Sequence, residues 1–504
     1  MTKFIKRIVF VGLIAIFAVL ALASCTKNDG TLEYKAAKGG YEIVGLKDGS
    51  VKDVIIPEKF NGKDIVSIGD NAFRGEYIES VFVPATVKSF GLNAFELCTY
   101  LKNVEVADAT SFAGASFENA YANPLNGGVE LYCGGKVVTE LVLNCESVSD
   151  FAYTGCTSIE GLKLSGVKSI GYGSFDGCIN LGALDLGESV QSIGSFAFSE
   201  NAFEALAIPA SVTGVGRSAF SQNEALVSVT LPASISALSD RMFFGCVSLE
   251  NINLDNLTSI GVGALYGCSA LEVVEIPTGL TRIEEYAFYN CSGITSVEIP
   301  ENSALEFIGE SAFCGCTALR SIYLDRAAEL KAIGDHAFEY CVSLENLTLP
   351  SGMETLGEWA FASCSSLKLI EDEGVGYIGN DGNPYVLLYK LLDDEKENIS
   401  VAIGTKFIHQ GAFLNAKSIK KVDMAGGVRS IGAQAFAFCI SLTEISISGS
   451  VRTIGDGALM GCVALEKLRF KGTSDQWNNS KNEKYVKKGT NWKYNAGKYA
   501  ISYG

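Results

Sequence analysis

Apolar and polar residues recur along this chain in one repeated order. Each repeat holds an Ala-aromatic pair, a Cys three positions after the aromatic residue, a Leu three positions later, and a short alternating segment often closed by Pro. Segments 67–84, 259–277 and 332–350 align on this order, although Leu265 replaces the aromatic residue and Glu76 the Cys. The alternation after the Leu predicts a short β-strand with one buried face. Its repetition predicts a solenoid in which each coil buries that face against the next.

The aromatic position is the register mark of the repeat. Sixteen marks occur, most of them 22 to 25 residues apart. They are Phe73, Phe95, Phe117, Tyr153, Phe175, Phe198, Phe220, Phe243, Leu265, Phe288, Phe313, Phe338, Phe361, Phe413, Phe436 and Leu459. The predicted fold class is therefore a repeat solenoid of about sixteen coils, with stacked short parallel β-strands and little helix. We expect the marks to stack as an internal column. The Gly that follows Ile in most repeats predicts a corner with positive φ or close backbone approach.

Two interruptions divide the repeats, and both follow an Asn-Pro pair, at 123–124 and at 383–384. Each is predicted to be an inserted hairpin, the first with a tight turn at Gly134-Gly135. The predicted divisions are 1–24 signal peptide, 25–50 lipidated tether and N-terminal cap, 51–122 repeats, 123–145 hairpin insertion, 146–370 repeats, 371–404 hairpin and loop insertion, 405–470 repeats, and 471–504 C-terminal cap. Caps are expected because a terminal coil must cover its open core edge.

Eleven of the fifteen cysteines occupy one position of the repeat, three residues after the mark. They are Cys98, Cys156, Cys178, Cys246, Cys268, Cys291, Cys316, Cys341, Cys364, Cys439 and Cys462. Asn201 and Asn223 take the same position. In-register stacking holds such residues about 4.8 Å apart, beyond the roughly 3.5 to 4.5 Å between the Cβ atoms of a disulfide. The pattern thus predicts a ladder of reduced thiols that fill a tight interior turn.

The first 25 residues carry the pattern of a secretory signal. Basic residues at positions 3, 6 and 7 precede an apolar run over 8–22, and the run ends in Leu22-Ala23-Ser24-Cys25. These last four residues resemble the bacterial lipobox, which implies that Cys25 is lipidated and becomes the new N-terminus. Cleavage without lipid and an uncleaved anchor are the alternatives. More than one acyl chain would give stable membrane attachment.

The chain as a whole resembles the BspA-like leucine-rich-repeat surface proteins. The resemblance is carried by the repeat order, the lipobox, the Tyr41-Glu-Ile-Val-Gly entry, the Asn-Pro-Tyr insertion at 383–385 and the Lys471-Gly-Thr-Ser-Asp-Gln-Trp477 ending. It implies a right-handed leucine-rich-repeat coil and a surface-exposed, lipid-anchored position on the bacterial outer membrane. It also implies adhesion to host matrix or plasma proteins or to other bacteria. No fixed functional residues carry over, because the shared positions are the buried ones.

Motifs argue against catalysis. The two histidines of the chain, His336 and His409, both lie within repeats and are expected to be structural. The sequence contains no His-Glu-x-x-His pair, no phosphate-binding Gly-rich loop with Lys and no Gly-x-Ser-x-Gly elbow. The closely spaced Cys314 and Cys316 lack a second pair for a metal site. We therefore expect no catalytic residues, no metal and no cofactor.

Charge restricts the class of partner. The formal net charge is −17, and removing the three basic residues of the signal makes it −20. This charge disfavours nucleic acid and favours a basic patch on a protein partner. The outward positions of the predicted strands lean acidic. We expect partner contact at Glu250, Asn253, Glu272, Glu275, Glu298 and Tyr323. The alternative is that these positions form an ordinary solvated face.

Two functions fit these expectations. The first is a non-catalytic cell-surface binding protein, an adhesin that engages host or microbial proteins through the exposed face of the solenoid. The second is a structural or scaffolding envelope lipoprotein without an external ligand. Protease accessibility on intact cells separates the two, because an inward-facing lipoprotein stays protected.

Overall fold

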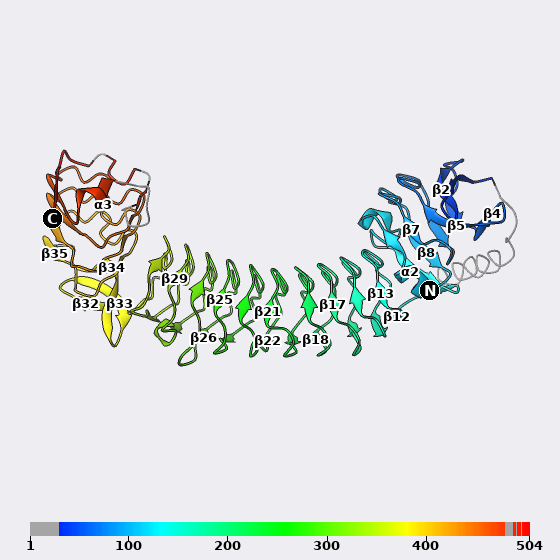
Figure 1. Ribbon diagram of the computed structural model, residues 1–504, viewed down its shortest axis with the longest axis horizontal. Coiled ribbons are helices and arrows are strands. Elements are labelled where there is room, and N and C mark those ends of the chain that lie inside the picture. The colour runs from blue at the N-terminus through cyan, green and yellow to red at the C-terminus, as the bar shows by residue number, and fades with distance from the viewer. Residues whose placement is uncertain (1–29, 479–486, 490, 495) are drawn as a thin grey trace, which may run out of the picture. The chain divides into compact units, whose positions relative to one another are not determined.

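The computed structural model describes residues 30–478, 487–489, 491–494 and 496–504 (Figure 1). The predicted signal peptide and Cys25 lie outside the described residues. The chain forms two compact units, Met1–Asn253 and Leu254–Gly504. The described part of each unit is a β-solenoid of stacked parallel strands. The predicted fold class is thereby confirmed.

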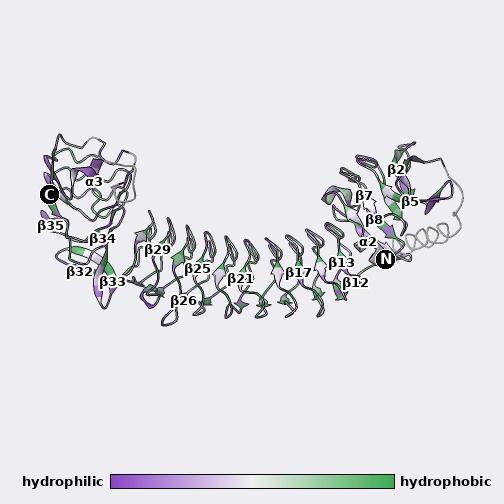
Figure 2. Cartoon of the chain, in the orientation of Figure 1, coloured by the Kyte–Doolittle hydropathy of each residue, from purple (hydrophilic) through white to green (hydrophobic). Residues whose placement is uncertain are grey.

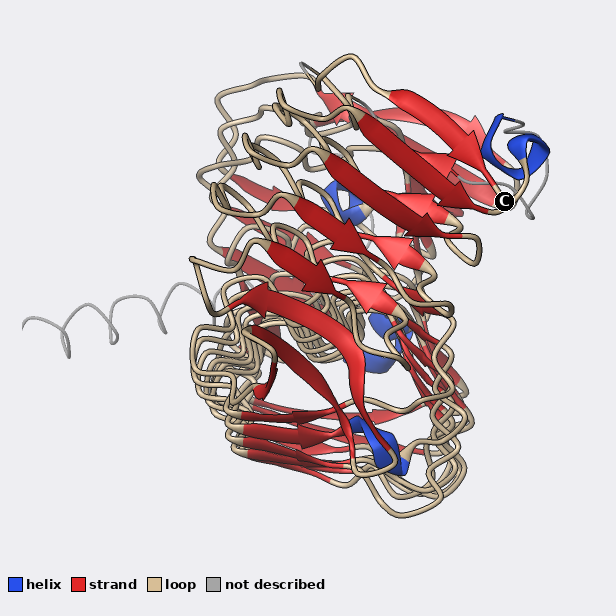
Figure 3. Cartoon of the chain, turned by 90° about the vertical axis from the view of Figure 1, so that its left-hand side faces the viewer, coloured by secondary structure: helices blue, strands red, loops and turns tan. Residues whose placement is uncertain are grey.

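Each regular coil contributes two short parallel strands, whereas the sequence predicts one. The first, which we call a corner strand, ends at the Ile before the corner Gly. The second, which we call a face strand, follows the Leu. In one coil these are β29 (Ala332–Ile333) and β30 (Asn346–Thr348). Figure 3 shows strands in layers on separate sides of the coil, and Figure 2 shows hydrophobic and hydrophilic residues alternating around it.

The described residues of the first unit form corner strands, face strands and one short α-helix. The corner sheets comprise β1 (Leu32–Ala37), β2 (Gly40–Leu46), β4 (Lys59–Phe60), β5 (Lys63–Ile68), β7 (Ser89–Phe90), β9 (Ser116–Phe117), β13 (Ser147–Val148), β15 (Ser169–Ile170), β17 (Ser192–Ile193), β19 (Gly214–Val215) and β21 (Ala237–Leu238). The face sheets comprise β3 (Asp53–Ile55), β6 (Ser80–Val83), β8 (Asn103–Val106), β10 (Glu130–Cys133), β11 (Lys136–Val137), β12 (Glu140–Asn144), β14 (Gly161–Ser165), β16 (Ala183–Asp185), β18 (Ala205–Ala207), β20 (Ser228–Thr230) and β22 (Asn251–Ile252). The helix is α2 (Ala109–Ala113), and a 3-10 turn spans Ala120–Ala122.

The second unit repeats this arrangement. Its corner sheets include β23 (Ser259–Ile260), β25 (Arg282–Ile283), β27 (Phe307–Ile308), β29, β31 (Thr355–Leu356), β32 (Ile370–Asp372), β33 (Val375–Asn380), β34 (Asn383–Leu391), β36 (Phe407–Ile408), β38 (Ser430–Ile431), β40 (Thr453–Ile454) and β42 (Lys487–Lys488). Its face sheets comprise β24 (Val273–Glu275), β26 (Ser296–Glu298), β28 (Ser321–Tyr323), β30, β35 (Asn398–Ser400), β37 (Lys421–Asp423), β39 (Glu444–Ser448), β41 (Lys467–Lys471) and β43 (Ala500–Tyr503). The helix is α3 (Ser474–Asn478), and a 3-10 turn spans Leu324–Arg326.

The solenoid has about nineteen turns, a minor difference from the sixteen expected. Corner strands β2, β34 and β42 belong to turns without an Ala-aromatic pair, so counting the marks omits them. The mark at Phe117 is wrong for another reason. Phe117 pairs in register with Phe90 in the corner sheet, so it occupies the position of the Ile rather than that of the mark.

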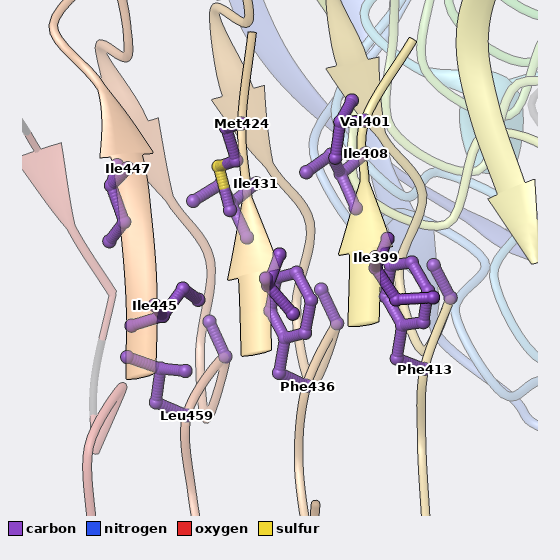
Figure 4. Close-up of a cluster of buried hydrophobic side chains, with 14 of the residues drawn as sticks. Ile399, Val401, Ile408, Phe413, Met424, Ile431, Phe436, Ile445, Ile447 and Leu459 are labelled. Atoms are coloured by element: carbon purple, nitrogen blue, oxygen red, sulfur yellow. The ribbon is translucent and has the colours of Figure 1, made fainter. Parts of the chain in front are cut away.

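The marks stack as the predicted internal column. In the first unit the ring centroids are 5.3, 5.3, 5.7 and 5.9 Å apart along Tyr153, Phe175, Phe198, Phe220 and Phe243. In the second unit they are 5.0, 5.2 and 5.3 Å apart along Phe288, Phe313, Phe338 and Phe361. All these ring pairs lie within 14° of parallel. Figure 4 shows Phe413 and Phe436 in such a stack beside Ile431 and Ile445.

The ladder cysteines also donate hydrogen bonds. The thiol of Cys341 donates to the backbone carbonyl of Phe313, the mark of the preceding coil, at 3.3 Å. The same contact recurs at Cys98, Cys178, Cys246, Cys291, Cys316, Cys364, Cys439 and Cys462 and, through the side-chain amide, at Asn201 and Asn223. Burial raises the pKa of the Cys291 thiol to about 12, so at neutral pH it remains a protonated donor. The position therefore takes a small hydrogen-bond donor, which explains why Asn replaces Cys.

Close approach of neighbouring coils explains the corner Gly. A Cβ atom on Gly309 would lie 2.5 Å from the backbone nitrogen of Glu285. The sequence predicts either positive φ or close backbone approach as the reason for Gly at the corner. Gly309 does not have positive φ, so close approach is the reason here. His409 takes the same position where the preceding corner strand is β34. Its ring packs against that of Tyr389, with the centroids 4.4 Å apart.

Antiparallel pairing occurs at both predicted insertions, in addition to the pairs β1–β2 and β4–β5 near the start of the described chain. In the first unit, β10 and β11 form a hairpin whose turn residues, Gly134 and Gly135, both have positive φ. In the second unit, β32, β33 and β34 form an antiparallel group. The corner strands up to β31 and those from β34 onward belong to separate sheets. The corner sheet of the second unit is therefore broken at this insertion.

Candidate binding surface

Three of the predicted contact residues form one row on the second unit, which we call the acidic row. Glu275 ends β24, Glu298 ends β26, and the two residues pair in register. Tyr323 ends β28, whose pairing with β26 continues this register. All three side chains are exposed, because the preceding residue of each strand points into the core. Parallel pairing sets the strands about 4.8 Å apart, so the row is a fixed array.

Glu272 lies beside the acidic row, in the segment before β24. Its carbonyl accepts the backbone amide of Thr295 at 2.8 Å, and the carbonyl of Thr295 accepts that of Arg320 at 2.9 Å. A second line of side chains therefore runs parallel to the acidic row and continues to Glu345. Glu345 forms an ion pair with Lys368 at 2.8 Å. That contact lowers the pKa of Glu345, so this carboxylate stays charged at neutral pH.

Glu250 and Asn253 belong to the first unit. The Glu250 side chain is exposed. Asn253 is half-buried, and its side-chain amide bonds the backbone of Leu231 twice. The Oδ1 atom accepts from the Leu231 amide at 2.7 Å, and Nδ2 donates to the Leu231 carbonyl at 3.0 Å. Asn253 therefore holds neighbouring turns together, while Glu250 faces solvent.

Residues that the sequence analysis missed surround Tyr323. The guanidinium carbon of Arg326 lies 5.2 Å from the centroid of the Tyr323 ring, and Arg326 forms an ion pair with Glu301 at 3.2 Å. Arg326 reaches the ring because it lies in the 3-10 turn that follows β28. Val273 is 50% exposed at the start of β24. The surface therefore combines carboxylates with exposed apolar groups, and no repeated pattern in the sequence marks Arg326 or Glu301.

The two histidines are held in structural contacts. His336 Nδ1 lies 2.6 Å from Glu339 Oε2 in the same turn. His409 is buried, and burial lowers its pKa to about 3, so its imidazole is neutral at physiological pH. Within the described ranges, no group of three or more His, Cys, Asp or Glu side chains is placed to hold a metal ion. None of the helices in the described part of the chain has the length and apolarity needed to cross a bilayer.

Comparison with solved structures finds leucine-rich repeat proteins from bacteria. A leucine-rich repeat protein from Bacteroides ovatus is 23% identical, with 94% of this chain and 98% of that chain covered and a TM-score of 0.42. A leucine rich cell surface protein from Faecalibacterium prausnitzii is 21% identical, with coverages of 90% and 96% and a TM-score of 0.41. A leucine-rich repeat protein from Eubacterium ventriosum is 20% identical, with coverages of 68% and 95% and a TM-score of 0.47. No curated protein matches the sequence.

A family model matches most of the chain. The model describes the BspA type leucine rich repeat region in six copies, and it matches residues 49–125, 146–272, 248–368 and 395–484. These stretches span well over half of the sequence and include the coils that carry the marks, the thiol ladder and the acidic row. The chain belongs to the BspA-type leucine-rich repeat family.

Proposed function

We propose that this protein is a non-catalytic binding protein of the bacterial cell surface, an adhesin that engages host or microbial proteins through its exposed face strands. The observation that carries the proposal is the acidic row. An aromatic ring beside two carboxylates offers both apolar contact and attraction to a basic patch on a partner. The contact residues in this proposal remain Glu250 and Asn253 on the first unit and Glu272, Glu275, Glu298 and Tyr323 on the second.

The repeat architecture supports such a role physically. Backbone ladders fix the spacing of the acidic row before any partner arrives. A preorganised surface loses little conformational entropy on binding. The conformational entropy of these residues is already lost when the chain folds, because the aromatic column and the thiol ladder hold each coil in place. The surface can therefore bind without rearrangement of the coils.

The proposal includes a lipid anchor on Cys25. Residues 1–24 would be removed as a signal peptide, residues 25–50 would form the tether and N-terminal cap, and residues 471–504 would form the C-terminal cap. The support is the Leu22-Ala23-Ser24-Cys25 sequence after an apolar run. The second candidate, an envelope scaffold without an external ligand, shares this anchor and differs in its orientation.

Protease treatment of intact cells tests the orientation. We expect externally added protease to degrade the protein on unbroken cells, while a periplasmic marker stays intact. The Cys25→Ala variant should leave the membrane fraction, because it lacks the acylated residue. Full protection of the wild-type protein would contradict the adhesin and favour the scaffold. A Cys25→Ala variant that still partitions fully into membranes would contradict the anchor.

Charge reversal tests the acidic row. We expect the triple variant Glu272→Lys, Glu275→Lys, Glu298→Lys to bind immobilised host matrix and plasma proteins about tenfold or more weakly, with an altered salt dependence. The physical reason is that the reversed charges repel the basic patch that the carboxylates attract. Biolayer interferometry at two salt concentrations measures both effects.

A matched triple variant controls for net charge. Asp394, Glu395 and Glu466 are exposed carboxylates of the same unit that lie away from the acidic row. Changing all three to Lys alters the net charge by the same amount, and we expect binding to stay within about twofold of wild type. Equal losses in the two triple variants would assign the effect to overall charge. An unchanged affinity in the first triple variant would rule out the acidic row as the contact surface.

A further inference from the structure

A cleft of about 1040 Å³ lies in the second unit, at the break in the corner sheet. One wall is residues 354–358, which include β31, the last corner strand before the break. Corner strands β36, β38, β40 and β42 form the other wall. The hairpin of β32 and β33, yellow in Figure 1, separates the two walls along the chain. The residues of the acidic row do not line this cleft.

The edge of β31 is open toward the cleft. In the preceding coil, the carbonyls of Lys331 and Ile333 accept the backbone amides of Glu354 and Gly357, each at 2.8 Å. The equivalent carbonyls in the coil of β31 belong to Glu354 and Leu356. Among the residues that the structure describes, no backbone amide donates to either of them. An open edge of this kind accepts an added extended chain as a further strand.

Cations form a column along the opposite wall, in which Arg429 and Arg452 line the cleft and Lys406 lies beside them. Lys406, Arg429 and Arg452 immediately precede β36, β38 and β40, and the register of these strands stacks them at about 4.8 Å per step. Their side chains donate to backbone carbonyls, Arg429 to that of Met353 at 3.0 Å and Arg452 to two carbonyls of its own turn. None of the three forms an ion pair with a carboxylate of the described chain. Such a column suits an added carboxylate.

The charges of the cleft are segregated along the strands. At the cation column, burial and the charge of Arg429 lower the pKa of Lys406, while Glu354 acts in the opposite direction. Beyond the corner, burial raises the pKa of Glu358, and the neighbouring charges of Asp456 and Asp335 raise it further. Among the described residues at the cleft, three cations and the single carboxylate of Glu354 lie before the strands, whereas Asp335 and Glu358 lie after them, so the cleft has a net positive end and a negative end.

We infer that this cleft binds an extended peptide segment of a partner protein, which carries an acidic residue and adds as a strand to the open edge of β31. Amides of the segment donate to the carbonyls of Glu354 and Leu356, and its acidic side chain lies against Arg429 and Arg452. The negative end of the cleft favours a basic residue about four positions away, since a strand rises about 3.3 Å per residue. This site goes beyond the proposed function, which concerns the face strands.

A labelled synthetic peptide tests the inference. The probe Thr-Asp-Val-Thr-Val-Lys-Thr alternates, and it carries the acidic and basic residues on one face. We expect saturable, salt-sensitive binding to the full chain by fluorescence polarisation. The double variant Arg429→Gln, Arg452→Gln should bind about tenfold or more weakly. Gln keeps a donor for the Met353 carbonyl, and an unchanged melting temperature confirms folding.

A peptide with Pro in place of its central Thr should also bind at least tenfold more weakly, because it lacks a backbone amide hydrogen at that position.

Several outcomes would overturn the inference. They are the absence of saturable binding up to about 1 mM peptide, equal affinity of the double variant, equal affinity of the Pro peptide, and binding of a heparin fragment without binding of the peptide. The triple variant Glu272→Lys, Glu275→Lys, Glu298→Lys serves as the control, and its peptide affinity should stay at the wild-type value. Failure of the cleft and failure of the acidic row are therefore distinguishable.

Discussion

Replacing Phe313 by Ala is expected to lower the free energy of unfolding by about 3 to 5 kcal/mol. The Phe313 ring is fully buried between the rings of Phe288 and Phe338, at centroid distances of 5.0 and 5.2 Å. Truncation removes both contacts. It also leaves a cavity that the coils close only in part, because backbone ladders on both sides fix their spacing. Each coil contacts only its neighbours, so adjacent coils lose stability as well.

Hydrogen exchange of the amides in residues 286–364 measures this loss locally. Urea unfolding followed by tryptophan fluorescence measures it in the same unit, which holds Trp359, Trp477 and Trp492. Tyr340→Ala is the matched control, because the Tyr340 ring is 53% exposed and its loss should change stability by about 0.5 kcal/mol or less. Phe313→Leu should fall between the two, since Leu265 holds the equivalent mark. Equal losses at Phe313 and Tyr340 would contradict the assignment of the marks to the core.

The sequence predicts best those features that the repeat encodes many times. The segment after Leu271 alternates in several coils, and the structure confirms its strand, with Val274 inward and Glu275 outward. Glu275 and Glu298 occupy the same position of successive repeats, so a sequence alignment already places them side by side, as their pairing confirms. The acidic row could be located without a structure for that reason.

Short elements and hydrogen-bond roles could not be predicted in this way. A corner strand such as β29 has two residues, too few for any alternation to show. Phe117 has the right residue type but lies in a corner strand, because aromatic residues fit both positions. The sequence also gives the position of Cys341 without revealing that the carbonyl of Phe313 lies within reach of its thiol.

The cleft depends on contacts between distant parts of the chain. Arg429 donates to the carbonyl of Met353, 76 residues away, and this contact exists only because the β32–β34 insertion breaks the corner sheet between them. The interruption of the repeat shows that the insertion is there, but not the path that its chain takes. Open carbonyls on β31 are likewise invisible in the sequence, because Glu354 and Leu356 resemble their counterparts in paired coils.

Replacing Asn223 by Leu is expected to cost about 3 kcal/mol or more, although the two side chains have similar size. The Asn223 side chain is fully buried. Its Nδ2 donates to the carbonyls of Phe198 and Phe220 at 3.0 and 2.8 Å, and its Oδ1 accepts the backbone amide of Asn201 at 2.7 Å. Leu makes none of these bonds, so the Phe198 carbonyl and the Asn201 amide lose their partner, while the Phe220 carbonyl keeps only the thiol of Cys246. Hydrogen exchange over residues 196–246 measures the loss.

Substitutions by Cys separate the donor role from the acceptor role. Asn223→Cys should cost about half as much as Asn223→Leu, because a thiol can donate to the mark carbonyl as Cys246 does to Phe220 at 3.3 Å, whereas the amide of Asn201 still loses its acceptor. Asn201→Cys should cost less again, since Oδ1 of Asn201 has no hydrogen-bond partner among the described residues. If Asn223→Cys were no more stable than Asn223→Leu, donation to the mark carbonyl would not be what selects Cys and Asn at this position. The predicted order of stability, Asn201→Cys above Asn223→Cys above Asn223→Leu, follows from counting which buried backbone groups keep a partner.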